Sequence, residues 1–284
     1  MFNQELQVAI LDNNIRIAYT EHGQRKHETI LFIHGLANYL RVWSWNIAGL
    51  ENHFHCIAID LPGNGFSSRG DYPYDMEFFA ETLFEFCEKT NLKKVILAGH
   101  SMGGQIAMTM ALKYPELVNS LLLFAPAGFE YYTPQEALLF KSAITLGDFL
   151  NMDEVHISQS INSSFFRQNK ISAQIIKDLN DIIKSNDRGP YRKMLDRCMN
   201  AMLNDQWFYK LPKLPQPALV FFGERDMLIP NRFLHPVSTK EIGEKGVAQM
   251  QNARLITYPD TGHFVQIEAF ESVNKEILNL QQGC

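Results

Sequence analysis

The feature that most constrains the fold is a series of short, continuous apolar runs separated by amphipathic helical patterns. The runs lie at residues 29–34, 55–60, 94–99, 120–125, 218–223 and 253–258. A strand that is apolar on both sides is buried on both faces, which is typical of a parallel sheet covered by helices. Helical patterns occupy residues 76–90, 103–113 and 268–280. The alternation therefore predicts a doubly wound α/β fold with right-handed crossovers.

The N-terminal residues follow a different pattern. Two stretches of alternating apolar and polar residues flank Asp12-Asn-Asn14 within residues 6–19. Alternation with a period of two around a turn sequence predicts a β-hairpin. Together with the buried runs, the hairpin gives a mostly parallel sheet of about eight strands.

Residues 127–213 interrupt the alternation. They contain several helical patterns, no convincing buried strand, and many large apolar side chains: Phe129, Tyr131, Tyr132, Phe140, Phe149, Met152, Phe165, Phe166, Met194, Met199, Met202, Trp207 and Phe208. A proline-rich stretch at 211–217 ends the segment, since proline cannot continue a helix. We expect a core domain formed by residues 1–126 and 214–284, with residues 127–213 inserted as a helical cap over the strand ends. Most of these apolar residues should pack within the insertion, and a few should face the active site.

Composition excludes several classes of protein. The 26 Lys and Arg against 31 Asp and Glu give a net charge of −5, so no basic surface for nucleic acid or anionic lipid is expected. No apolar run approaches the roughly 20 residues that span a bilayer. The N-terminus lacks the features of a secretory signal, and the four cysteines are irregularly spaced, which favours a reducing, cytoplasmic location over disulfides or zinc binding. They are Cys56, Cys87, Cys198 and Cys284. No metal or cofactor is expected.

A candidate nucleophile lies in Gly99-His-Ser-Met-Gly103. A Gly-x-Ser-x-Gly pentapeptide is weak evidence alone, but this one follows a buried strand and opens a helix, the context of a nucleophile elbow. The sharp turn leaves no room for side chains at the two glycines and exposes the Ser101 hydroxyl at the helix N-terminus. There the helix dipole and free N–H groups favour a developing negative charge.

A serine hydroxyl needs a base to act as a nucleophile at neutral pH. His263 lies in Asp260-Thr-Gly-His263, directly after the last predicted strand and therefore at the catalytic edge of the sheet. The sequence predicts that His34 shapes a loop and that His100 turns away from the serine. We expect five other histidines to be surface residues: His22, His27, His53, His156 and His235.

The base in turn needs a carboxylate to hold its tautomer. Asp226 follows the penultimate strand and can approach the same edge, so it is the favoured acid. Glu130, after the strand that ends at Ala125, is the rival, and Glu224 is a minor competitor. Asp60 also ends a strand, but it precedes Leu-Pro-Gly-Asn-Gly and is expected to brace that loop.

These motifs together resemble the α/β-hydrolase superfamily over residues of about 25–280. Four features agree in order: His34-Gly35 after a strand, Asp60-Leu-Pro-Gly-Asn-Gly-Phe-Ser, the Ser101 elbow, and the paired Asp226 and His263 loops. The resemblance implies an α/β-hydrolase fold with a helical cap and a Ser101-Asp226-His263 triad. It also implies an oxyanion hole formed by the backbone N–H groups of Leu36 and Met102.

The serine narrows the chemistry that the resemblance implies. Capped members that hydrolyse haloalkanes or epoxides carry aspartate at the elbow, whereas this chain has Ser101. The expected activity is hydrolysis of a small, largely apolar carboxylic ester or thioester through an acyl-enzyme. Alternatives are carbon–carbon hydrolysis of ring-cleavage products, which Phe264 in place of a tryptophan disfavours, a serine haloperoxidase or perhydrolase, and a non-catalytic ligand receptor. A small-molecule ester is the expected partner, and the oligomeric state stays open.

Overall fold

The computed structural model describes residues 5–146, 159, 161–167, 170–184 and 188–282. Its centre is an eight-stranded sheet in the order β1-β2-β4-β3-β5-β6-β7-β8. The strands are β1 (Gln7–Ile10), β2 (Arg16–His22), β3 (Thr29–Ile33), β4 (His55–Ile59), β5 (Val95–His100), β6 (Val118–Phe124), β7 (Ala218–Gly223) and β8 (Ala253–Tyr258). Strand β2 pairs antiparallel with β1 and β4, and the remaining pairings are parallel. The mostly parallel sheet and the N-terminal hairpin are both as the sequence predicts.

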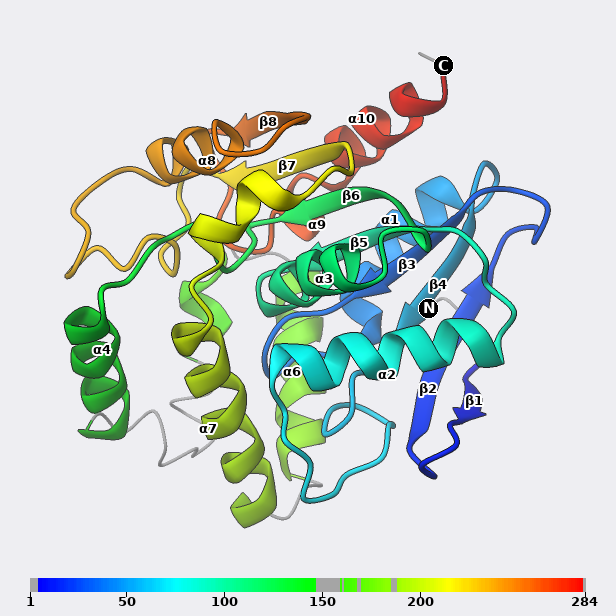
Figure 1. The fold of residues 1–284 in the computed structure, drawn as a ribbon, viewed down its shortest axis with the longest axis horizontal. Coiled ribbons are helices and arrows are strands. Elements are labelled where there is room, and N and C mark those ends of the chain that lie inside the picture. Colours follow the sequence, from blue (N-terminus) through cyan, green and yellow to red (C-terminus); the bar gives the residue numbers. More distant parts are fainter. Residues whose placement is uncertain (1–4, 147–158, 160, 168–169, 185–187, 283–284) are drawn as a thin grey trace.

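Helices cover both faces of this sheet (Figure 1). The helices outside the insertion are η1 (Leu40–Trp43), α1 (Ser44–Leu50), α2 (Met76–Lys89), α3 (Met102–Lys113), α8 (Thr239–Val247), α9 (Val265–Glu268) and α10 (Phe270–Gln282). Alternation along β3 divides the core: Leu31 and Ile33 pack with α2 and α3, whereas Ile30 and Phe32 pack with α1 and α10. Because successive strand residues point to opposite faces, one continuous apolar run supplies both layers.

Helix α2 shows how local sequence sets these elements. The Asp75 side chain caps its N-terminus by accepting from the Phe78 backbone N–H at 2.7 Å. Its predicted apolar side is buried against the sheet through Phe79, Leu83 and Phe86. An N-cap satisfies a backbone donor that the helix leaves free, so cap and apolar spacing together fix where the helix starts and which side it buries.

Between β6 and β7 the chain leaves the sheet. The elements there are α4 (Pro134–Leu146), α6 (Lys170–Lys184), α7 (Arg188–Asn204) and η3 (Trp207–Lys213), and the described part of residues 127–213 contains no strand. In Figure 1, α4, α6 and α7 form a group away from α8 and α10. We call residues 127–213 the insertion, and its exact domain boundaries stay a prediction.

The core around Trp43 provides a test of packing. Its ring is fully buried, with centroids 5.2 Å from both Phe32 and Phe124. Trp43→Ala leaves a large cavity, so we expect a loss of about 3–5 kcal/mol in the free energy of unfolding, measured by urea denaturation. Trp43→Phe, which keeps most of the ring contacts, should lose less. A loss below about 1 kcal/mol for Trp43→Ala would contradict this packing.

Candidate active site

Ser101 lies in the turn between β5 and α3 with a strained backbone, φ 53° and ψ −119°. Two glycines make the turn possible. A Cβ on Gly99 would lie 2.3 Å from the Gly103 carbonyl oxygen, and a Cβ on Gly103 would lie 2.4 Å from that of Ile33. Neither approach is tolerated by a side chain, so only glycine fits both positions. The sequence places Ser101 in a nucleophile elbow, and the structure has that geometry.

His263 and Asp226 meet across two strand ends. His263 follows β8 and Asp226 follows β7, and the His263 Nδ1 lies 2.8 Å from the Asp226 Oδ2. The other carboxylate oxygen, Oδ1, accepts from the backbone N–H groups of Leu228 at 2.7 Å and Ile229 at 3.0 Å. Both side chains are almost completely buried. With Nδ1 donating to the carboxylate, the His263 Nε2 is left as the acceptor that a general base needs.

Two of the rival carboxylates, Glu130 and Glu224, have partners other than His263. Glu130 accepts from the Asn231 backbone N–H at 2.9 Å, and its Oε1 lies 2.6 Å from the His235 Nδ1. Glu224 accepts from the Thr257 hydroxyl on β8 at 2.7 Å. Of the four candidate acids, Asp226 is the one in contact with His263.

Asp60 braces its loop, as the sequence predicts. It accepts from the backbone N–H groups of Leu40 at 2.7 Å and Phe66 at 2.8 Å. Burial raises the pKa of Asp60 to about 7, against the effect of these two donors. His34 braces the same region, because its Nδ1 donates to the Gly35 carbonyl and its Nε2 accepts from the Leu61 N–H. Burial lowers the pKa of His34 to about 4, so its ring is neutral.

Three other histidines differ from expectation. His100 was expected to turn away from Ser101, yet its ring lines the same cavity and its Nε2 donates to the His263 carbonyl at 3.0 Å. Burial, followed by the nearby His263, holds the pKa of His100 well below its usual value. His22 and His235 were expected at the surface, but their side chains are only 21% and 22% exposed, and they pair with Glu51 and Glu130. Contacts with other segments of the chain cover these rings in part and bury His100 fully. The predicted surface residue His156 lies outside the described residues.

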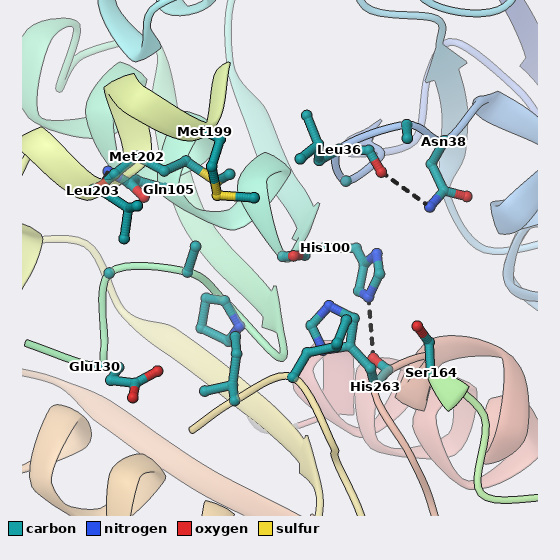
Figure 2. Close-up of a pocket in the computed structure, with 18 of the residues that line it drawn as sticks. Leu36, Asn38, His100, Gln105, Glu130, Ser164, Met199, Met202, Leu203 and His263 are labelled. Atoms are coloured by element: carbon teal, nitrogen blue, oxygen red, sulfur yellow. Dashed lines mark hydrogen bonds between the residues drawn. The ribbon is translucent and has the colours of Figure 1, made fainter. Parts of the chain in front are cut away.

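Ser101 and His263 line one cavity of about 540 Å³. Most of its wall is apolar, and part of it comes from the insertion, through side chains such as Tyr132, Phe140 and Met199. Figure 2 shows Gln105, Glu130, Met199, Met202 and Leu203 to the left of His263, and Asn38 and Ser164 to its right. Among the large apolar residues of the insertion, Tyr132, Phe140, Met199 and Met202 reach the cavity, while Phe129, Phe165, Met194 and Trp207 are buried in packing. Phe149 and Met152 lie outside the described residues.

The two residues expected to form an oxyanion hole lie close to Ser101. Leu36 lines the cavity in the loop after β3, and Met102 directly follows Ser101 as the first residue of α3. The first N–H groups of a helix have no acceptor within the helix, so the Met102 N–H is oriented by α3 itself. The Met102 side chain is fully buried in the core, away from the chemistry.

A segment of the insertion, residues 164–167, is bound to the loop that carries His263. The His263 N–H donates to the Ser164 carbonyl at 2.8 Å, and Phe165 stacks on Phe264 with centroids 4.5 Å apart. Sequence reasoning missed the residue that completes this contact, Glu268. Its Oε1 accepts from the Gly262 N–H at 2.8 Å, and its Oε2 accepts from the N–H groups of Phe166 and Arg167 at 3.0 and 3.1 Å.

Glu268 could not be recognised from periodicity, because its partners come from another part of the chain. Burial raises its pKa, and the three backbone N–H donors act in the opposite direction. The one available signal is its position five residues after His263 at the end of α9. Glu268 therefore holds the histidine loop and the insertion in register.

The described residues lack a metal-binding cluster and a membrane-spanning helix. They contain no group of three His, Cys, Asp or Glu placed to bind a metal ion. No helix among the described elements combines the length and apolar content needed to cross a bilayer.

Comparison with known proteins identifies the family. A family model for the alpha/beta hydrolase fold matches residues 28–270. The chain therefore belongs to the α/β-hydrolase family, and it is a hydrolase by that membership.

Individual relatives are distant. The chain is 27% identical over 269 residues to an uncharacterized hydrolase of Bacillus subtilis (strain 168), covering 91% of this chain and 92% of that protein. It is 25% identical over 275 residues to a monoacylglycerol lipase of Homo sapiens, covering 93% of this chain and 78% of the lipase. Among solved structures, a probable hydrolytic enzyme from Pseudomonas aeruginosa PAO1 superposes with a TM-score of 0.84 at 21% identity, covering 98% and 95% of the two chains. At that identity the match shows the fold alone.

The contacts of Glu268 predict a local effect of its substitution. Glu268→Gln replaces one acceptor oxygen by a donor that faces backbone N–H groups. We expect a loss of about 1–3 kcal/mol in stability and faster amide hydrogen exchange in residues 164–167 and 262–264. Glu271→Gln, on the exposed first turn of α10, is the matched control and should change neither. Unchanged exchange in Glu268→Gln would contradict the role given to this carboxylate.

Proposed function

We propose that this protein is a serine hydrolase that cleaves small, largely apolar carboxylic esters or thioesters, with Ser101, His263 and Asp226 as its catalytic residues. The observation that carries the proposal is the shared cavity: Ser101 at a strained elbow and His263, paired with Asp226 at 2.8 Å, line the same wall. This arrangement suits a nucleophile, a base and an orienting acid.

The mechanism follows from these positions. The Ser101 hydroxyl attacks the ester carbonyl while the His263 Nε2 takes its proton. The same imidazolium then protonates the leaving alcohol, and a water molecule, activated by His263, releases the acid from the acyl-enzyme. Asp226 keeps the ring in the correct tautomer and stabilises its charge. The backbone N–H groups of Leu36 and Met102 would bind the tetrahedral oxyanion, each contributing about 3–4 kcal/mol by precedent.

The cavity supports a small, largely apolar substrate. Its volume of about 540 Å³ lies within the range of small-ligand sites, and its described lining is dominated by apolar side chains. The resemblance to a monoacylglycerol lipase, an enzyme that acts on an acyl ester, supports ester chemistry here. Carbon–carbon hydrolysis stays the second candidate, because the same three residues could catalyse it.

Domain organisation and location belong to the same proposal. We infer that the insertion, residues 127–213, acts as a cap domain that shapes the substrate site above a core of residues 1–126 and 214–284. A cytoplasmic location is supported by the free, buried thiols of Cys56, Cys87 and Cys198. Cys284 lies outside the described residues.

The nucleophile can be tested directly. Ser101→Ala should reduce kcat/KM for 4-nitrophenyl butyrate by at least roughly a thousandfold, because the attacking oxygen is gone. The fold should persist, as measured by circular dichroism and thermal unfolding. Ser142→Ala, on α4 of the insertion, is the matched control and should keep full activity.

Covalent labelling provides an independent test. A serine-directed fluorophosphonate should modify Ser101 in the wild-type protein and leave Ser101→Ala unlabelled, as identified by peptide mass spectrometry. Undiminished ester turnover in Ser101→Ala would refute the assignment of the nucleophile. A folded wild-type protein that neither turns over esters nor reacts with the probe would favour a ligand-binding role.

A further inference from the structure

The charges around the cavity restrict its substrate further. None of the described residues that line the cavity is Lys or Arg, whereas Glu130 and Asp205 both belong to its wall. The Asp205 carboxylate pairs with Lys210. Glu130 is the more deeply buried of the two, with a side chain only 5% exposed.

Glu130 belongs to a cluster around His235. The His235 ring lies between two carboxylates, with Nδ1 2.6 Å from the Glu130 Oε1 and Nε2 3.5 Å from the Glu136 Oε1. The described cluster thus holds two carboxylates and a single histidine, so acidic groups outnumber basic ones on this side of the cavity.

Among the described residues of the cavity wall, none offers a positive charge to a substrate carboxylate. Moving an anion from water into a mostly apolar cavity is costly unless a cation or several donors pair with it. Here the anion would meet Glu130, and like charges separated by a few ångströms in a partly buried site repel strongly. A neutral ester meets neither cost.

We propose that Glu130 is a specificity-determining residue that restricts this site to esters that are uncharged at the end that enters the Glu130 side of the cavity. Figure 2 places Glu130 on the same side of His263 as Gln105, Met199 and Met202, which marks the region concerned. The inference rests on the proposed ester hydrolysis. It also disfavours carboxylate-bearing ring-cleavage products as substrates, and so separates the two candidate functions.

The experiment compares substrates that carry either a terminal carboxylate or its methyl ester, and each kcat/KM is divided by the rate constant for hydroxide-catalysed hydrolysis of the same ester so that intrinsic reactivity cancels. The first pair carries this group on the acyl end: mono-4-nitrophenyl adipate and its methyl-capped form. The second pair carries it on the alcohol end: 4-carboxyphenyl hexanoate and its methyl ester. For the wild-type protein, we expect kcat/KM to favour the neutral member of each pair, by roughly 100-fold where the charged end enters the Glu130 side.

Substitution then assigns the effect to one residue. Glu130→Gln keeps the size and an acceptor oxygen but removes the charge. In the pair whose charged end meets Glu130, this substitution should lower the ratio of kcat/KM for the neutral ester to that for the charged ester to roughly 10-fold. It should change kcat/KM for the neutral esters by less than about threefold. Glu136→Gln removes a charge from the same cluster but from outside the described cavity wall, so it is the matched control and should reduce the ratios by less than Glu130→Gln does.

The outcomes separate this inference from the proposed function. Absence of hydrolysis for every ester would refute the proposed function itself. Equal hydrolysis of the neutral and charged members by the wild-type protein would leave that function standing and overturn the inference, even if Glu130→Gln did not fold. Ratios that stay the same in a folded Glu130→Gln protein would also overturn it, because the discrimination would then have another source.

Discussion

The proposed active site depends on one strained turn. Ser101 adopts a φ of 53° between β5 and α3, a conformation that costs free energy in an L-residue and persists only where the surroundings enforce it. Here the surroundings are backbone atoms, since the carbonyls of Gly103 and Ile33 leave no space for a Cβ at Gly99 or Gly103. The central strands and α3 hold the turn in place. The position of the hydroxyl is therefore set by packing of the sheet, not by a mobile loop.

The insertion supplies part of the wall of the cavity that Ser101 and His263 line. Residues 164–167 contact the histidine loop through Ser164, Phe165 and the carboxylate of Glu268. Glu130, which also belongs to the insertion, accepts a hydrogen bond from the backbone N–H of Asn231, in the segment that follows Asp226. Both loops that carry catalytic candidates are thus fixed by residues near or within the insertion. Changes in the insertion should affect the positions of the catalytic groups as well as the space for substrate.

The sequence predicted the elements with the strongest local signals. Buried strands such as β3 and β4 were recognisable because an uninterrupted apolar run has few alternatives, and α2 because its apolar residues recur at helical spacing. Predictions about single polar side chains were weaker. His235 was expected at the surface and His100 away from the serine, and both line or adjoin the cavity. Their environments are formed by segments more than a hundred residues apart.

By itself, the sequence determined the sheet, the nucleophile elbow and the loops that follow β7 and β8, because these depend on periodicity and on glycine at close backbone contacts. Only the tertiary structure decided which carboxylate faces His263, how Glu268 joins the insertion to the histidine loop, and which charge lines the cavity. Those outcomes depend on distances of about 3 Å between side chains that are remote in sequence. No local pattern encodes such distances, since they are set by how the layers pack together.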